Sequence, residues 1–207
     1  MINQPRLILV RHGQSVWNLE NKFTGWVDVD LSEKGIEEAK LAGEKLKGFK
    51  LDQAFTSELI RAKHTLNIIL STLNQCGIPV EKNKALNERM YGELEGLNKE
   101  EVKSKYGEVQ FNRWRRSFLD APPGGESLKM TQDRVLPYYQ SYIRPCLILG
   151  ETILVVAHGN SLRALMMYLE NLTESQIENT EIITGMPRWY RYSLEGQNLN
   201  LEGIYNL

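Results

Sequence analysis

Two histidines in this 207-residue chain each follow a short apolar run and precede a glycine. His12 follows residues 7–10, and His158 follows residues 152–157. Apolar runs of this kind predict buried strands, and open α/β sheets bind ligands beyond the carboxyl ends of their strands. Glycine permits close approach of the backbone, and helix N-termini offer free N–H groups to an anion. One His-Gly pair would be an ordinary turn, whereas two such placements favour a shared anion site.

Positive side chains are distributed so that several could join this site. Arg11 adjoins the first histidine, Arg61 follows a second expected strand, and Lys99 and the pair Arg115-Arg116 come later in the chain. Guanidinium and ammonium groups bind phosphate through charge-assisted hydrogen bonds. Taken alone, Arg115-Arg116 would be read as a solvated helix face. Together, these residues indicate a site for a phosphorylated ligand.

Two further features bear on the chemistry of such a site. Glu88, in a stretch with little regular periodicity, could exchange a proton with a substrate hydroxyl, although the pattern alone favours a structural or solvated role. A divalent cation would be repelled by Arg11, and no His-x-x-x-His or paired carboxylate motif is present. We therefore expect no metal at the two histidines.

Composition sets limits on the partners of the chain. Lys and Arg total 25 against 26 Asp and Glu, and hydrophobic residues make up 42%. This balance predicts a globular protein and gives no argument for binding nucleic acid or a membrane surface. The apolar runs are too short to span a bilayer, and the first residues do not resemble a signal peptide. We expect a cytoplasmic protein in which Cys76 and Cys146 are reduced core residues.

The elements that must position these residues alternate between strands and helices. We expect an α/β fold with a mostly parallel central sheet and helices on both faces. The chain is read as one domain, 1–207, with a helical insertion at 83–126 over the site. The expected strands are 7–10, 52–56 and 152–157, with an edge strand at 79–82. The expected helices run from Ser32 to Gly48 and over 59–73, 111–119, 127–143 and 161–171, and a further helix begins at an Asn98/Glu101 capping box. A hairpin of 188–194 and 199–205 is expected at the end of the chain.

Several motifs identify a resemblance to a known family. The run Leu9-Val10-Arg11-His12-Gly13-Gln14-Ser15 resembles the signature of the histidine phosphatase (phosphoglycerate mutase-like) superfamily. Further stretches look like the cofactor-dependent phosphoglycerate mutases, and the resemblance extends to about residue 192. These stretches are Trp17-Asn18, Phe23-Thr24-Gly25-Trp26, Thr56-Ser57 with Arg61-Ala62, Glu88-Arg89-Met90-Tyr91-Gly92, Gly96-Leu97-Asn98-Lys99, Trp114-Arg115-Arg116 and the run from Ala157 to Arg163.

The resemblance implies a role for each matching residue. His12 would be the nucleophile that forms a phosphohistidine, with Arg11, Arg61 and His158 around the transferring group and Glu88 as general acid/base. The residues implied to bind the substrate are Arg11, Asn18, Thr24, Gly25, Arg61, Glu88, Tyr91, Lys99, Arg115, Arg116, Gly159 and Asn160.

The implied activity is an isomerase that interconverts 2- and 3-phosphoglycerate in glycolysis and gluconeogenesis. In such families 2,3-bisphosphoglycerate primes the nucleophile, and no metal is needed. The implied partners are small-molecule phosphoglycerates, and a homodimer is an open expectation because dimers are common among similar proteins. The alternatives are a metal-independent phosphatase for a small phosphate ester and a phosphate-binding module without catalysis.

The chain departs from the family pattern at three places. Met90 stands where members commonly have histidine, the stretch at 121–127 is short, and the sequence ends at Leu207, where longer members add a tail over the site. A covering segment excludes water from a reactive intermediate. We therefore expect faster loss of phosphoryl groups to water than in members with a tail.

Overall fold

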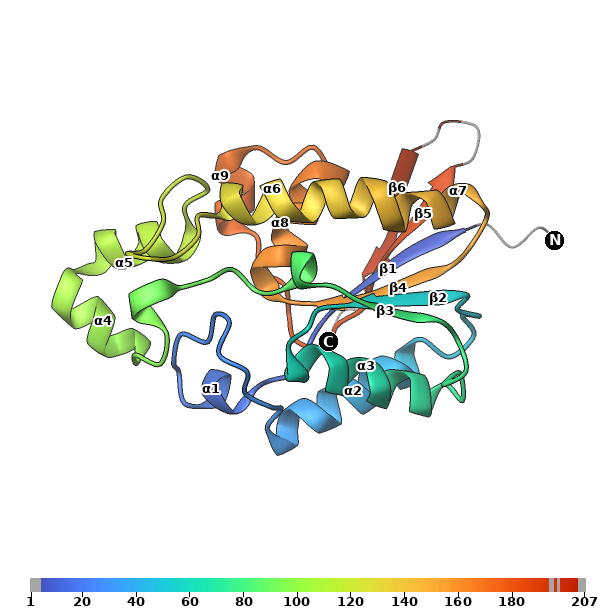
Figure 1. Cartoon of the computed structure of the whole chain (residues 1–207), viewed down its shortest axis with the longest axis horizontal. Coiled ribbons are helices and arrows are strands. Elements are labelled where there is room, and N and C mark those ends of the chain that lie inside the picture. The colour runs from blue at the N-terminus through green and yellow to red at the C-terminus, as the bar shows by residue number, and fades with distance from the viewer. Residues whose placement is uncertain (1–4, 194–195, 197, 205–207) are drawn as a thin grey trace.

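The computed structural model describes residues 5–193, 196 and 198–204. Within them six strands form one sheet in the order β3-β2-β4-β1-β5-β6. The strands are β1 (Arg6–Arg11), β2 (Gln53–Thr56), β3 (Val80–Lys82), β4 (Ile153–Ala157), β5 (Arg188–Ser193) and β6 (Asn198–Ile204). β3, β2, β4 and β1 are mutually parallel, whereas β5 is antiparallel to β1 and β6 is antiparallel to β5. The predicted mostly parallel sheet is confirmed (Figure 1).

Helices cover both faces of this sheet, as the alternating side chains of the central strands require. Ile8 and Val10 of β1 face the core shared with α2 (Glu33–Lys45) and α3 (Ile60–Thr72). Leu7 and Leu9 face the opposite core. The helices on that side are α6 (Leu128–Tyr138), the π-helical turn η3 (Tyr139–Ile143), α7 (Arg144–Ile148) and α8 (Gly159–Leu169). All five residues of β4 are buried between the two layers.

The remaining elements lie around the ends of the strands. They are α1 (Val16–Leu19), η1 (Lys84–Leu86), η2 (Gly92–Leu94), α4 (Lys99–Tyr106), α5 (Glu108–Arg116) and α9 (Glu174–Asn179). Residues 83–126 are all described and contribute no strand to the sheet. α4 and α5 project beyond the sheet, at the left end of the molecule in Figure 1.

Some predicted local details were wrong. Asn98 caps α4, but its side chain accepts the Glu100 N–H and forms no capping box with Glu101. The helix expected at 111–119 is α5, which begins directly after Gly107 and ends at Arg116. The helix expected at 161–171 starts at Gly159 and ends at Leu169. Cys76 is exposed because it lies in the turn after α3, outside the core.

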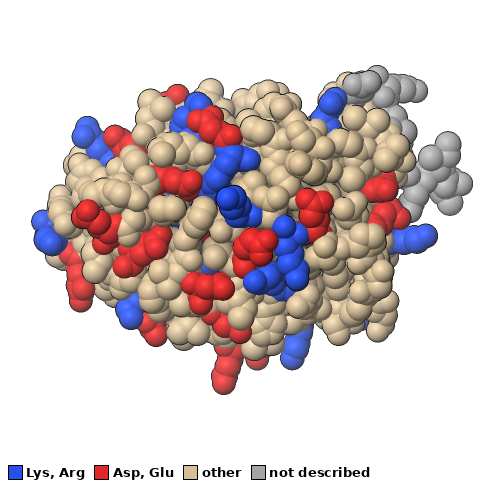
Figure 2. Space-filling view, viewed as in Figure 1, with Lys and Arg blue, Asp and Glu red and all other residues tan. Residues whose placement is uncertain are grey.

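The predicted terminal hairpin is present as the antiparallel pair β5 and β6. Its expected end residues Leu194 and Tyr205 lie outside the described residues. No helix in the described part of the chain has the length and apolar character needed to cross a membrane. Acidic and basic side chains are interspersed on the face shown in Figure 2, in keeping with a net charge of −1.

Candidate active site

The two histidines meet because their strands are parallel neighbours. Arg11 at the end of β1 pairs with Ala157 at the end of β4, and the His12 N–H donates to the Ala157 carbonyl at 2.9 Å. The imidazole rings of His12 and His158 lie 4.9 Å apart between centroids, at 61° to each other. Both side chains are buried. The sheet therefore brings together two residues that are 146 positions apart in the sequence.

His12 is held with one ring nitrogen ready to react. Its Nδ1 lies 2.7 Å from the Gly13 carbonyl oxygen, which can only accept, so Nδ1 carries the proton and Nε2 keeps a free lone pair. Burial, together with the positive charges of Arg61 and Arg11, holds the pKa of His12 well below its usual value. The neutral, nucleophilic form is therefore the stable form at neutral pH.

His158 is oriented by a hydroxyl group behind it. Its Nε2 lies 2.7 Å from Ser57 Oγ, which also accepts the Leu59 N–H at 3.2 Å. The Ser57 proton is then available for Nε2, which places the proton of a neutral His158 on Nδ1. Burial and the charge of Arg61 hold the pKa of His158 well below its usual value. His158 is thus a neutral hydrogen-bond donor beside His12.

Two arginines flank the histidines. Arg61, on the first turn of α3, is buried and donates to the carbonyls of Gly25 at 2.8 Å and Val27 at 3.1 Å. Burial lowers its pKa to about 10, so the guanidinium stays charged at neutral pH. Arg11 donates to the Ile182 carbonyl at 2.7 Å. These fixed charges add a strong positive potential around His12.

Glu88 enters the site from the loop between η1 and η2. Its Oε1 accepts the Arg89 N–H at 2.7 Å and the Asn160 N–H, in the first turn of α8, at 3.0 Å. A methyl group added at Gly159 would lie 3.6 Å from Arg11 Nε and 3.7 Å from Glu88 Oε2. The second carboxylate oxygen of Glu88 therefore lies beside Gly159, as the Arg11 guanidinium does.

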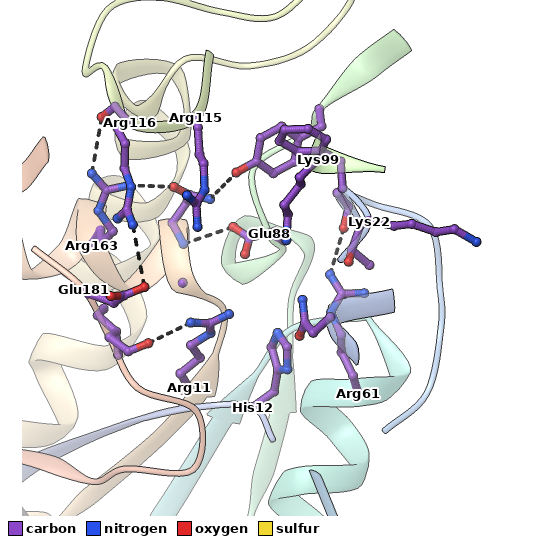
Figure 3. A pocket seen from close by; sticks show the side chains of 18 of the residues that line it. Arg11, His12, Lys22, Arg61, Glu88, Lys99, Arg115, Arg116, Arg163 and Glu181 are labelled. Carbon is purple, nitrogen blue, oxygen red and sulfur yellow. Dashed lines mark hydrogen bonds and ion pairs between the residues drawn. The ribbon is translucent and has the colours of Figure 1, made fainter. Parts of the chain in front are cut away.

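A second group of cations comes from α4 and α5. Figure 3 shows Lys99, Arg115 and Arg116 on one side of the cleft, Arg11, His12 and Arg61 on the other, and Glu88 between them. Burial and the neighbouring positive charges lower the pKa of Lys99 and of Arg115. Arg116 lies 3.6 Å from Glu181 Oε1.

Two buried arginines anchor the C-terminal end of α5, where Arg115 and Arg116 lie. Arg89 donates to the carbonyls of Trp114 at 2.9 Å and Arg115 at 2.8 Å. Arg163 donates to the Arg116 carbonyl at 3.3 Å. These bonds satisfy carbonyls that a helix end leaves unpaired, and they fix the position of the second cation group.

These side chains line one cleft with about 690 Å³ of empty space, counting the part open to solvent. It contains every residue assigned to substrate binding from the sequence: Arg11, Asn18, Thr24, Gly25, Arg61, Glu88, Tyr91, Lys99, Arg115, Arg116, Gly159 and Asn160. His12 also lines the cleft, while His158 lies buried against it. Seven Lys or Arg residues and two Glu residues face this space, so it suits an anion with more than one charged group.

Unsatisfied donors in the site fit a phosphate group. Arg11 Nε, Thr24 Oγ1 and His158 Nδ1 are buried and find no hydrogen-bond partner among the described residues. Buried polar atoms ordinarily have a partner, since leaving one unpaired costs about 1–3 kcal/mol. Phosphoryl oxygens would accept from all three. The site can thus hold a phosphorylated anion against the free Nε2 of His12.

Six residues of the cleft were not assigned from the sequence. They are Lys22, Phe23, Arg163, Thr180, Glu181 and Ile182. Phe23 and Arg163 lie inside motifs that carry the family resemblance, so a signal for them was present. Residues 180–182 have no such signal. They reach the cleft because the Gly185 N–H bonds to the Arg11 carbonyl and draws this segment to the end of β1.

Comparison with known proteins places this site in a family. A sequence model of the histidine phosphatase superfamily (branch 1) matches residues 7–206. The chain belongs to the histidine phosphatase superfamily. The paired histidines at the ends of β1 and β4 both lie within the matched residues.

Curated relatives are similar to the chain over nearly its whole length. A protein of Nitrobacter hamburgensis named 2,3-bisphosphoglycerate-dependent phosphoglycerate mutase is 59% identical over 196 residues, covering 94% of this chain and 95% of the relative. A protein of the same name from Cytophaga hutchinsonii is 56% identical over 191 residues, covering 91% and 88%.

Solved structures share the fold at lower identity. Bacillus stearothermophilus YhfR has a TM-score of 0.83 and 28% identity, with 95% of each chain covered. The alpha-ribazole phosphatase from Shigella flexneri has a TM-score of 0.82 and 24% identity, covering 96% of this chain and 95% of the other. These likenesses agree with the observed sheet and helix layers of a histidine phosphatase.

Proposed function

We propose that this protein is a phosphoglycerate mutase that interconverts 2- and 3-phosphoglycerate through a phosphohistidine on His12. The observation that carries the proposal is the pairing of a neutral, buried His12 with two groups of cations on opposite sides of one cleft. High similarity to curated phosphoglycerate mutases over more than nine-tenths of the chain supports it.

His12 Nε2 would attack the phosphorus of the bound ester, forming a P–N bond as the P–O bond to the glycerate oxygen breaks. When bound, 2,3-bisphosphoglycerate would supply the phosphoryl group that first loads His12. Arg11 and Arg61 would balance the negative charge on the equatorial oxygens, and His158 Nδ1–H would donate to one of them. This transfer demands mainly positioning and charge stabilisation from the protein, and these residues are already fixed before substrate binds.

Glu88 would move the proton that the exchange of hydroxyls requires. As phosphate leaves a glycerate oxygen, that oxygen gains a proton, and as the other hydroxyl attacks the phosphohistidine, it loses one. A carboxylate within hydrogen-bond reach of both hydroxyls can serve as acid and then as base. The amides of Arg89 and Asn160 fix Glu88 Oε1, which leaves Oε2 for this proton.

The second cation group would separate mutase from phosphatase activity. Lys99, Arg115 and Arg116 would hold the carboxylate and the second phosphate while the phosphoryl group rests on His12. A glycerate retained in this way can turn and take the phosphoryl group back at its other hydroxyl. Without that hold, water would take the phosphoryl group and the product would be inorganic phosphate.

The proposal extends to the location, domain organisation, metal requirement and oligomeric state of the protein. The protein would act in the cytoplasm on small-molecule phosphoglycerates, as one domain in which the 83–126 segment supplies the second cation group. Metal would not be required, and a homodimer is the oligomeric state to test.

The test is conversion of 3-phosphoglycerate to 2-phosphoglycerate in a coupled assay, with inorganic phosphate followed in parallel. EDTA is present throughout, and catalytic 2,3-bisphosphoglycerate is added or omitted. Turnover that survives EDTA and is stimulated by the bisphosphate supports the mutase. Phosphate release without isomerisation would assign the protein instead to the phosphatases, which several structural neighbours are named as.

A further inference from the structure

Arg134 on α6 makes an unusual number of bonds to the loop that carries Glu88. Its Nη1 donates to the carbonyls of Ala85 at 2.7 Å and Asn87 at 3.0 Å, and its Nη2 donates to the Glu88 carbonyl at 2.9 Å. Residues 87–91, between η1 and η2, form no helix or strand. Their carbonyls therefore depend on partners from elsewhere in the fold.

Glu126 completes the attachment from the other side of Arg134. The guanidinium pairs with both carboxylate oxygens, Nε to Oε1 at 3.0 Å and Nη2 to Oε2 at 2.9 Å. Glu126 Oε2 also accepts the Met90 N–H at 3.0 Å, and the Glu126 N–H donates to the Met90 carbonyl at 2.8 Å. Residues on either side of Glu88 are thus tied to one half-buried ion pair.

The Gly124-Gly125 turn brings Glu126 into this position. A methyl group at Gly125 would lie 2.7 Å from the Met90 carbonyl oxygen, which is closer than real side chains pack. The Trp26 indole Nε1 also donates to the Glu88 carbonyl, and Arg134 lies over the Trp26 ring, 5.7 Å from its centroid. The main chain of Glu88 is therefore held by two donors, neither of which touches the cleft.

We propose that Arg134, braced by Glu126, is the positioning residue for Glu88. The inference rests on the proposed function, in which Glu88 moves the proton. A guanidinium forks in a fixed plane and can join three carbonyls and a carboxylate at once. Since a displacement of about 1 Å in an active site can cost about 100-fold in rate, loss of this anchor would reduce proton transfer without removing any group that binds substrate.

The chain offers a closely matched control for the structural cost of losing such a pair. Arg188 pairs with Glu170 through the same two-bond geometry, and the side chains are 17% and 18% exposed, against 20% and 14% for Arg134 and Glu126. Arg188 does not line the cleft. Arg134→Gln and Arg188→Gln should therefore both lower Tm, and only Arg134→Gln should slow the reaction.

The expected kinetic effect is a fall in kcat of at least about tenfold in Arg134→Gln, with KM changed less than about twofold. Arg134→Lys keeps the positive charge but lacks the planar set of donors that joins the carbonyls to Glu126, so it should lose activity while staying folded. Full activity in Arg134→Lys would overturn the geometric role. An equal loss of kcat in Arg134→Gln and Arg188→Gln would overturn it too, because that result marks a general structural effect.

A double-mutant cycle with Glu88→Gln tests whether Arg134 acts through Glu88. In the Glu88→Gln background, Arg134→Gln should lower kcat less than twofold further. If Arg134→Gln lowers kcat by the same factor in the Glu88→Gln background as in the wild type, the inference is overturned. Failure of the proposed function is seen separately, because the wild type would then release phosphate without isomerisation. If the wild type only releases phosphate, the double-mutant cycle is measured with the rate of phosphate release in place of isomerisation, and the same outcomes are expected.

Discussion

Removal of two charges from the second cation group tests the division of labour within the cleft. The double substitution Arg115→Ala with Arg116→Ala leaves His12, Arg11 and Arg61 untouched. The backbone carbonyls that anchor α5 also remain, since Arg89 and Arg163 bond to main-chain atoms there. We therefore expect weaker binding of the substrate, with the chemical step on His12 preserved.

The size of the effect follows from the surroundings of each arginine. A hydrogen bond to a charged group contributes about 1.5–3 kcal/mol, and Arg115 is partly buried among other cations. Arg116 is already paired with Glu181, whose side chain is 68% exposed, so its contribution is nearer 1 kcal/mol. Together they give about 3 kcal/mol, which corresponds to about a 100-fold rise in KM for 3-phosphoglycerate.

Two measurements separate binding from chemistry in this variant. Steady-state assays give KM, and rapid-quench phosphorylation of His12 at saturating 2,3-bisphosphoglycerate gives the rate constant of the chemical step. Arg113→Ala is the matched control, because Arg113 is exposed on the same helix and does not line the cleft. An unchanged KM in the double variant, or equal losses in the two measurements, would refute the assignment of a separate binding group.

Three further predictions address the histidines. His12→Ala should abolish isomerisation and phosphate release together, and turnover of either kind in that variant would contradict the phosphohistidine route. Ser57→Ala leaves His158 Nε2 without its partner and should lower kcat by up to roughly tenfold, the equivalent of one neutral hydrogen bond; an unchanged kcat would exclude this orienting role.

The third is a pH dependence. Because the pKa of His12 is depressed in the fold, its phosphorylation rate should stay level from pH 8 to 6.5. The free energy of unfolding should instead fall as the pH drops below about 6.5, by up to about 1.4 kcal/mol per pH unit for each of His12 and His158, since only the unfolded chain takes up these protons. A stability that is level from pH 7 to 5 would contradict the buried, neutral histidines.

The parts of the fold that the sequence predicted are those with a strong local pattern. Continuous apolar runs followed by His-Gly indicated β1 and β4, and helical spacing indicated α2 and α3. Short elements were harder to predict. α9 was not predicted, because six residues are too few to show a helical pattern. Its start does have a signal, since Thr173 and Gln176 form a capping box. Cys76 was misplaced because an apolar neighbourhood in sequence does not reveal that a turn exposes the side chain.

The candidate site also contains some residues that a local sequence pattern predicted and others that it did not. His12 and His158 could be brought together by reasoning about strand ends, because carboxyl ends of parallel strands share an edge. Arg134 bonds to the Glu88 carbonyl, 46 positions away, and the helical pattern of α6 does not predict this bond. Glu181 lines the cleft through a contact between Gly185 and Arg11, which depends on how the chain returns to the sheet. Such contacts follow from tertiary packing and carry no local signal.

The most direct test of the account is where a phosphoryl group attaches after brief exposure to 2,3-bisphosphoglycerate. Intact-mass measurement counts the groups, and phosphorus NMR of the denatured protein distinguishes the two ring nitrogens. Since Nδ1 of His12 donates to the Gly13 carbonyl, we predict one phosphoryl group on Nε2 of His12 and none in His12→Ala. No adduct, an adduct on Nδ1, or one that persists in His12→Ala would contradict the account.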